Sequence, residues 1–388
     1  MYFLRSSRRV FARLCVLFAA VIAGASGSLL GVCGPFTDVS DAAFCPFVLE
    51  IFTLGITTGT SPTTYDPSGN VSRIQMAAFL SRTVDRTLQR ASRRAALNQF
   101  WTTQSPANLG LTTTIPLADL VQSDGLDIWV ASGTGTVIRV RGSDGSLLQT
   151  WTGAVAAQGV LAAMSQVFVA GQISPGRLYR IDPTQPAGAV TTVASTLGDN
   201  PKGIAYDGGR IWTANFGGSV SIVTPTVSLP WTVTTVTTGF QVGMIGALYD
   251  GANVWVTDIN GASLQKLDAA AGVLQTVTVG TQPFFPIFDG TNIWVPNSGS
   301  ASVSVVRSST GAVLATLTGN GLNQPKTAAF DGERILVTNP GGGSVSLWKA
   351  ADLSPIGNFQ TGTTPTGACS DGINFWIGLP NANKLARF

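Results

Sequence analysis

The sequence predicts a mainly β protein built around a closed ring of similar sheets, and three observations support this. First, one phrase recurs every 39 to 44 residues along the chain after residue 120. Second, each copy lies among short runs of β-branched and aromatic residues bounded by Gly, Asn and Asp, which is typical of strands and hairpins. Third, seven copies are present. A period of about forty residues made of short strands indicates a propeller, so we expect a seven-bladed β-propeller.

The repeated phrase is Asp-Gly, two spacer residues, an apolar residue and Trp. A copy with Leu336 in place of Trp begins at Asp331, and a degenerate copy runs from Ala163 to Phe168. Asp-Gly supplies a positive φ and a side-chain oxygen that can hold a turn, so we expect structural aspartates. The Trp residues are expected to pack between neighbouring blades. The full copies begin at Asp124, Asp207, Asp250, Asp289 and Asp371.

Each unit carries four strand signals, but the last one ends at Phe388 after its third strand, Lys384–Phe388. Residues 111–117 form a strand signal with no unit of its own. Pairing of this segment with the last blade would close the ring and protect its edges. The propeller is therefore expected over residues 109–388. In the sixth unit the expected strands are Thr327–Phe330, Arg334–Thr338, Ser344–Trp348 and Ile356–Gln360.

The order of motifs within a unit is Pro, Asp-Gly, Ile-Trp-Val and Asn, followed by Gly-Ser-Val-Ser and a later Thr-Gly. This order resembles the YVTN family of β-propeller repeats over roughly residues 110–388. The resemblance implies a fold and does not imply an activity.

The N-terminus has the features of an export signal, expected over residues 1–25. Basic residues precede the apolar run Leu14–Ala23, and Ala23-Gly24-Ala25 is a small-residue cleavage site. Ser7–Arg13 resembles the twin-arginine export motif, while an ordinary general-secretion signal is the alternative. A retained anchor is a third interpretation. We expect an exported protein of the periplasm, cell wall or cell surface.

Residues 26–84 are expected to form a small helical module. The segment has Phe-Thr-Asp-Val at its start, an apolar helix signal, Gly-Ile-Thr-Thr-Gly, Tyr-Asp-Pro, and Ser-Arg-Ile-Gln-Met-Ala-Ala-Phe-Leu. Ser72 or Asn70 can cap the second helix, whose apolar face carries Ile74, Met76, Ala77 and Leu80. This order of motifs resembles a surface-layer homology (SLH) domain. The resemblance implies binding of cell-wall polysaccharide and points to Asp38 and Arg73; a structural helical cap is the alternative.

Two further features precede the propeller. Residues 85–108 are Arg-rich at helical spacing, which predicts a solvated helical linker or a stripe that contacts anionic wall polymer or lipid headgroups at the membrane surface. Cys33 and Cys45 are expected to form a disulfide in an oxidising compartment. Cys369 is expected to be a buried thiol.

Composition excludes several classes of chemistry. The chain has no His, which removes Ser-His-Asp and Cys-His catalysis and His-ligated metals. Nothing indicates a cofactor or a metal site, and we expect no enzyme. Residues 101–388 carry 13 basic and 15 acidic groups, and this balance argues against a nucleic-acid partner.

Two positions per unit are expected on the face around the central channel: eight residues after each phrase Asp, and five residues before it. Lys202 and Lys326 stand out because both follow Pro at the start of an inner strand. A polar face with nearby Phe side chains could bind a peptide or a glycan. The candidate binding residues are Lys202, Asn215, Asp258, Phe284, Asn297, Lys326 and Asn339.

The leading functional hypothesis is an exported cell-envelope binding or scaffold protein. In it the SLH-like module attaches to wall polysaccharide and the propeller engages envelope proteins or glycans. The alternative is a periplasmic hydrolase or lyase that uses Asp and Lys on the loop face. A passive surface-coat component is a third hypothesis.

Overall fold

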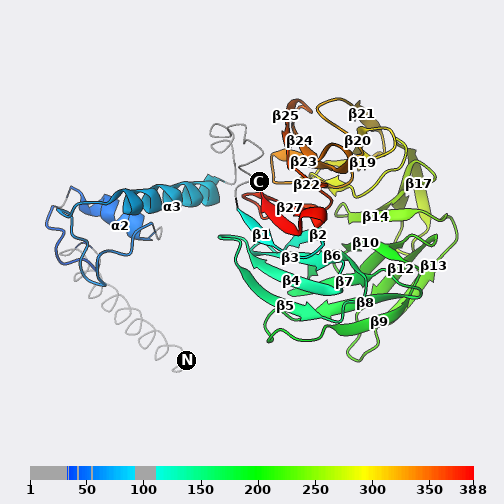
Figure 1. Ribbon diagram of the computed structural model, residues 1–388, viewed down its shortest axis with the longest axis horizontal. Coiled ribbons are helices and arrows are strands. Elements are labelled where there is room, and N and C mark those ends of the chain that lie inside the picture. Colours follow the sequence, from blue (N-terminus) through cyan, green and yellow to red (C-terminus); the bar gives the residue numbers. More distant parts are fainter. Residues whose placement is uncertain (1–32, 34, 42, 54–55, 92–110) are drawn as a thin grey trace, which may run out of the picture. The chain divides into compact units, whose positions relative to one another are not determined.

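The computed structural model describes residues 33, 35–41, 43–53, 56–91 and 111–388. The chain divides into two compact units, Met1–Gln99 and Phe100–Phe388 (Figure 1). The expected export signal and residues 92–108 of the expected linker lie outside the described residues. Within the described residues, no helix combines the length and apolar character needed to cross a membrane.

The second unit is a seven-bladed β-propeller, as expected: seven four-stranded sheets follow one another around a ring (Figure 1). From the innermost strand outward, the first three blades are β2 Ala118–Ser123, β3 Asp127–Ser132, β4 Thr136–Arg141 and β5 Leu147–Thr152; β6 Ala157–Ala163, β7 Gln166–Gly171, β8 Gly176–Ile181 and β9 Thr191–Leu197; and β10 Pro201–Tyr206, β11 Ile211–Asn215, β12 Ser219–Thr224 and β13 Thr232–Val236.

The next three blades follow the same order, and in the sixth the observed strands agree with the expected ones to within one residue at each end. These blades are β14 Met244–Tyr249, β15 Val254–Asp258, β16 Ser263–Leu267 and β17 Val273–Thr278; β18 Ile287–Phe288, β19 Asn292–Asn297, β20 Ser302–Arg307 and β21 Val313–Leu317; and β22 Ala328–Phe330, β23 Arg334–Asn339, β24 Ser344–Lys349 and β25 Pro355–Gln360.

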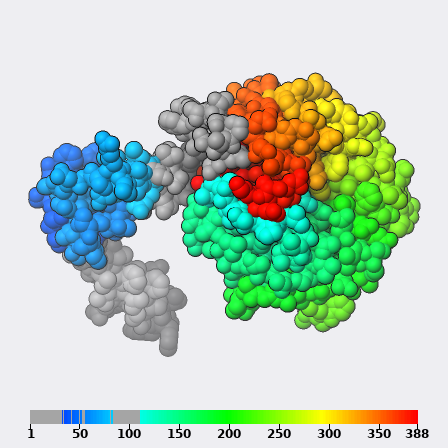
Figure 2. All heavy atoms as spheres, in the orientation of Figure 1, coloured from blue at the N-terminus to red at the C-terminus, as the bar shows by residue number. Residues whose placement is uncertain are grey.

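The last blade joins the two ends of the ring. It consists of β26 Ala368–Ser370, β27 Phe375–Leu379, β28 Lys384–Arg387 and, as its outer strand, β1 Thr112–Thr114. β1 pairs antiparallel with β28, with Thr113 opposite Leu385. The first and last parts of the propeller, cyan and red, therefore meet on its surface (Figure 2). Two short 3-10 turns, η2 Pro340–Gly342 and η3 Pro380–Ala382, precede β24 and β28.

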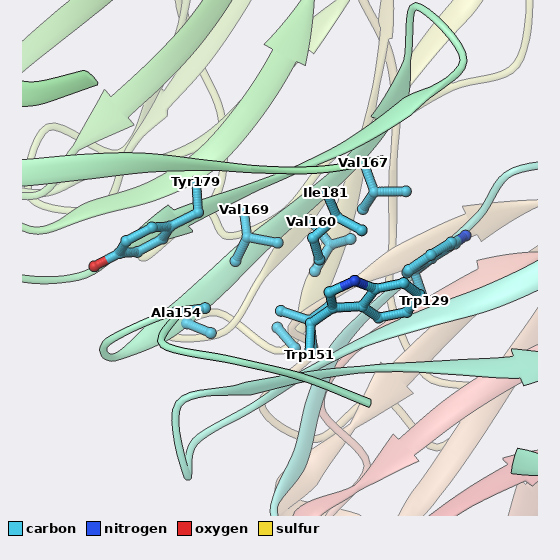
Figure 3. Close-up of a cluster of buried hydrophobic side chains, with 11 residues drawn as sticks. Trp129, Trp151, Ala154, Val160, Val167, Val169, Tyr179 and Ile181 are labelled. Carbon is cyan, nitrogen blue, oxygen red and sulfur yellow. The ribbon is translucent and has the colours of Figure 1, made fainter. Parts of the chain in front are cut away.

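The core lies between the blades. The second strand of the first blade, β3, is buried over its whole length, and Trp129 from this strand is fully enclosed. It packs with Trp151 of the same blade against Val167 and Ile181 of the next blade (Figure 3). This confirms that the repeated Trp packs between neighbouring blades, where a large apolar side chain fills the space between twisted sheets.

The first unit contains two helices, α2 Cys45–Thr53 and α3 Arg73–Ala91. Cys33 and Cys45 form the expected disulfide, with their Cα atoms 5.4 Å apart. At the start of α3 the backbone N–H of Gln75 donates to Ser72 Oγ at 3.2 Å, and the N–H of Ser72 donates to Gln75 Oε1 at 2.8 Å. This reciprocal pair is a capping box, so Ser72 rather than Asn70 is the cap.

The apolar face expected on the second helix is not buried. Ile74 is 84% exposed, Leu80 is 60% exposed and Met76 is 47% exposed. The small core of this unit is instead made by Cys33, Phe36 and Val48. The helical spacing of these apolar residues was recognised correctly, but a periodic face packs only where a partner surface is present.

Candidate functional site

The inner strands of the blades surround a cavity of about 490 Å³. This volume is within the range of small-molecule sites in proteins. Only Lys202 among its lining residues carries a full charge, and Cys369 lies in the wall as a buried free thiol whose pKa is raised by burial and then by Asp371. Most of the wall is hydrocarbon, including Leu120, Leu161, Ile204, Leu248 and Ile287.

Side chains at the start of the inner strands are directed by irregular pairing. Asp119, Gln158 and Lys202 each fall where the register of an inner strand shifts against its neighbour. A β-bulge of this kind redirects a side chain away from the regular alternation of a strand. All three side chains are half-buried. Together with Phe284 and Lys326 they form what we call the channel mouth.

The charged groups of the channel mouth interact with one another. Gln158 Nε2 donates to Asp119 Oδ2 at 2.7 Å, while Asp119 Oδ1 is buried and has no hydrogen-bond partner within the described residues. Burial is the main cause that lowers the pKa of Lys202, the positive charge of Lys326 lowers it further, and the carboxylate of Asp119 raises it. Lys202, in the third blade, is thus the residue on which the charges of Lys326, in the sixth blade, and of Asp119, in the first, both act.

One aromatic ring contacts Lys202, and two others lie near the backbone of Lys326. Lys202 Nζ lies 5.7 Å from the ring centroid of Phe216, within the range of a cation–π contact. Phe284 and Phe285 stand with ring centroids 6.2 Å apart, and the backbone N–H of Phe285 donates to the carbonyl of Lys326 at 3.0 Å. The backbones of Phe285 and Lys326 are therefore in contact across two blades.

The four candidate residues that lie eight positions after the phrase Asp need correction. Asn215, Asn297 and Asn339 are fully buried at the ends of β11, β19 and β23, and Asp258 is 1% exposed at the end of β15. The amide of Asn215 donates to Ser219 Oγ at 3.0 Å and to Ser221 Oγ at 2.9 Å. Such side chains join strands within a blade, and their amide groups are not available to a ligand.

The other members of this set make equivalent internal bonds. Asn297 Nδ2 donates to Ser302 Oγ at 3.1 Å and to Ser304 Oγ at 3.0 Å. Asn339 Nδ2 donates to Ser346 Oγ at 2.8 Å, and Asp258 Oδ1 accepts the backbone N–H of Asn260 and Gly261. The Ser-x-Ser pattern in the third strand is thus the partner of the repeated Asn.

Sequence reasoning missed the cavity behind the mouth, although a signal for it is present. Glycine recurs four residues before the phrase position in four units, at Gly159, Gly203, Gly246 and Gly367. A Cβ atom on Gly203 would lie 2.5 Å from the backbone N of Ala247 in the next blade. Glycine at this point lets neighbouring inner strands approach closely, so the glycines mark the wall of the channel.

In the first unit, Asp38 has a structural role. Its carboxylate accepts the backbone N–H of Tyr65 at 2.9 Å and of Asp66 at 2.7 Å. These hydrogen bonds, the one from Tyr65 first, lower the pKa of Asp38. Arg73 is exposed at the first position of α3. Of the two residues suggested by the resemblance, only Arg73 has an exposed side chain.

No group of three or more metal-ligating side chains that could hold a metal ion occurs among the described residues.

A family model for the S-layer homology domain matches residues 35–77. Residues 35–77 are an S-layer homology domain. The SLH domain covers α2 and the start of α3 and contains both Asp38 and Arg73.

Solved structures share the propeller fold. The chain is similar to virginiamycin B lyase from Staphylococcus aureus, with 12% identity and a TM-score of 0.61 over 71% of this chain and 97% of the lyase. It is also similar to the WD40 propeller of Doa1, with 13% identity and a TM-score of 0.60 over 74% and 97% of the two chains. A third similar structure is the hydrazine synthase of Kuenenia stuttgartiensis, with 16% identity and a TM-score of 0.59 over 72% of this chain and 97% of the synthase chain. A comparison with curated sequences gives no match.

Proposed function

We propose that this chain is an exported cell-envelope protein in which the SLH domain attaches the propeller to cell-wall polysaccharide and the propeller serves as a binding platform. The observation that carries the proposal is the SLH domain at residues 35–77. The propeller adds a closed ring whose channel mouth carries charged and polar side chains from several blades, with Asp119 bonded to Gln158 and Lys202 against Phe216. One fold can host many unrelated activities. The residues of the channel mouth, and not the fold, therefore indicate what the ring binds.

Arg73 is the residue through which the SLH domain is expected to contact an anionic or hydroxyl-rich polymer. Its side chain is exposed at the start of α3, and arginine offers five donors in a fixed planar arrangement. Asp38 supports the same domain indirectly because it holds the backbone at Tyr65 and Asp66. Export by either the twin-arginine or the general secretory route would deliver the domain to its polymer.

The test is co-sedimentation of the full mature chain with purified cell walls, before and after extraction of their polysaccharide. We expect sedimentation with intact walls only, and a clear reduction for Arg73→Ala. The matched control is Arg177→Ala, which removes an exposed arginine on β8 of the propeller. Equal sedimentation of Arg73→Ala and the wild type would contradict the role of Arg73. No sedimentation of the wild type would contradict wall attachment itself.

The second candidate function is a hydrolase or lyase that uses Asp119, Lys202 and Lys326. It is favoured by the lyases among the similar structures. One of these, described as catalytically inactive, has a histidine replaced by alanine and is in complex with quinupristin. This chain has no histidine, so a lyase of that kind would need a different base. Incubation with quinupristin, followed by liquid chromatography, tests the activity; an unchanged substrate peak would count against it.

A further inference from the structure

The channel mouth has an excess of positive charge. Lys202 lines the cavity, and the positive charge of Lys326 and the negative charge of Asp119 both act on it. One oxygen of that carboxylate already accepts the amide of Gln158. Like charges in one site repel each other, and a nearby anion relieves that repulsion. One carboxylate balances only one of the two positive charges.

Behind the mouth, the cavity offers a hydrocarbon surface. Leu161, Ile204 and Ile287 line it and are only partly buried, so their side chains are within reach of a molecule in the channel. On the inner strand β10 the cavity is lined over five residues, from Lys202 to Tyr206, a length of about 16 Å at the usual rise of a strand. A mostly apolar cavity of this length suits an extended alkyl chain.

One ring marks the boundary between the two regions. Phe216 is half-buried, and its ring centroid lies 5.7 Å from Lys202 Nζ. It therefore places apolar surface next to a cation. A ligand that matches this order must carry an anionic group at one end and hydrocarbon directly behind it.

We propose that the propeller binds an anionic amphiphile, with a carboxylate head held between Lys202 and Lys326 and an unbranched alkyl chain in the cavity. This inference rests on the proposed role of the propeller as a binding platform and names the class of ligand. The head group adds the second negative charge that the mouth lacks. The tail covers the partly exposed apolar wall, and burial of each methylene group strengthens binding about fourfold.

The probe is dodecanoate, titrated into the full chain by isothermal calorimetry below its micelle concentration. We expect one site per chain, and we expect Lys202→Met and Lys326→Met each to weaken binding at least tenfold. Lys349→Met, at an exposed position on β24, is the matched control and should bind as the wild type does. Circular dichroism melting of each variant shows whether its ring is intact, and Lys202→Arg should retain most of the binding.

Three comparison ligands separate head from tail. Octanoate should bind at least tenfold more weakly than dodecanoate, because its chain is shorter. Dodecyltrimethylammonium should not compete, because it presents a positive charge to the lysines. Acetate and inorganic phosphate should not displace dodecanoate at equal concentration; displacement by either would reduce the site to a simple anion site and overturn the proposal.

The SLH domain also exposes apolar side chains, including Phe44 and Ile74, so an amphiphile bound there must be distinguished. Dodecanoate binding that persists unchanged in Lys202→Met and Lys326→Met would overturn the channel proposal. Binding that persists unchanged in Ile74→Ser supports it. The outcome is independent of the wall test: loss of wall attachment with intact dodecanoate binding contradicts the anchoring function alone, and the reverse result contradicts only the amphiphile site.

Discussion

The indole Nε1 of Trp255 donates a 2.7 Å hydrogen bond to Oδ2 of Asp250, across the turn between β14 and β15. The other carboxylate oxygen, Oδ1, accepts the backbone N–H of Ala252 at 2.9 Å and of Asn253 at 2.7 Å. One carboxylate thus fixes the turn and the orientation of a buried ring. The same indole–carboxylate bond, at 2.7 to 2.8 Å, occurs in four other blades between Trp129 and Asp124, Trp212 and Asp207, Trp294 and Asp289, and Trp376 and Asp371.

Replacement of Asp250 by Ala is expected to lower the free energy of unfolding by about 2–4 kcal/mol, because a buried indole N–H and two turn N–H groups lose their acceptor. Urea denaturation followed by Trp fluorescence measures this change. Asp268→Ala is the matched control, since Asp268 Oδ1 accepts two backbone N–H groups, those of Ala270 and Gly272, and no indole of the described residues donates to it. Equal losses in the two variants would show that the indole bond contributes nothing measurable.

The sixth blade replaces the indole with a guanidinium. Arg334 Nε and Nη2 lie 2.8 and 2.7 Å from Asp331 Oδ2, and Arg334 is 1% exposed. Removal of one partner from a buried ion pair typically costs about 3–5 kcal/mol, so Arg334→Asn should destabilise the ring strongly. Arg334→Asn combined with Leu336→Trp restores the phrase of the fifth blade and should recover part of the loss. A double variant no more stable than Arg334→Asn would contradict this equivalence.

Asp207 makes stability depend on pH. Burial raises its pKa, but the hydrogen bonds from the Trp212 indole, the backbone of Gly209 and Arg210, and the Arg210 side chain together outweigh burial and lower it below 3.8. The depressed pKa means that the ionised group stabilises the fold above about pH 4, and this contribution is lost as the pH falls through the folded-state pKa. Asp207→Asn should therefore lose less stability than the wild type between pH 5 and pH 2 in urea denaturation. Parallel losses would contradict the assignment.

Two alanines occupy a turn conformation that suits glycine. The residue before the third strand has a positive φ in Gly135, Gly218 and Gly343, and the same position holds Ala262 with φ 48° and Ala301 with φ 45°. An L-residue is strained in this region, so Ala301→Gly should raise the free energy of unfolding by about 0.5–1 kcal/mol. Ala315→Gly, within strand β21, is the control and should lower it by a similar amount. A change of the same sign in both variants would refute the argument.

Sequence periodicity was sufficient to predict the propeller ring, because every blade repeats the same local sequence pattern. In that pattern, strand residues alternate with a period of two and a turn signal ends the strand. It also placed Lys202 and Lys326 at or just before the start of inner strands, where the structure has them half-buried; their part in binding stays a prediction. It could not separate them from Asn215, Asn297 and Asn339, because a polar residue at a strand end looks the same in sequence whether it faces solvent or a Ser hydroxyl. The exposure of Ile74 was equally hidden, because a helical pattern predicts an apolar face and not its partner.

The short pairing between β1 and β28 has a mechanical consequence. β1 is the propeller strand closest in sequence to the SLH domain, and it is held to β28 over three paired residues, with Leu111 O accepting the N–H of Arg387 at 2.8 Å just beside them. If the SLH domain is fixed to the wall and a load acts on the propeller, tension along the chain reaches the ring first at this strand. Separation of β1 from β28 would then open the ring at this one seam and leave the other six sheets intact, because each of those sheets is built from four strands that are consecutive in sequence.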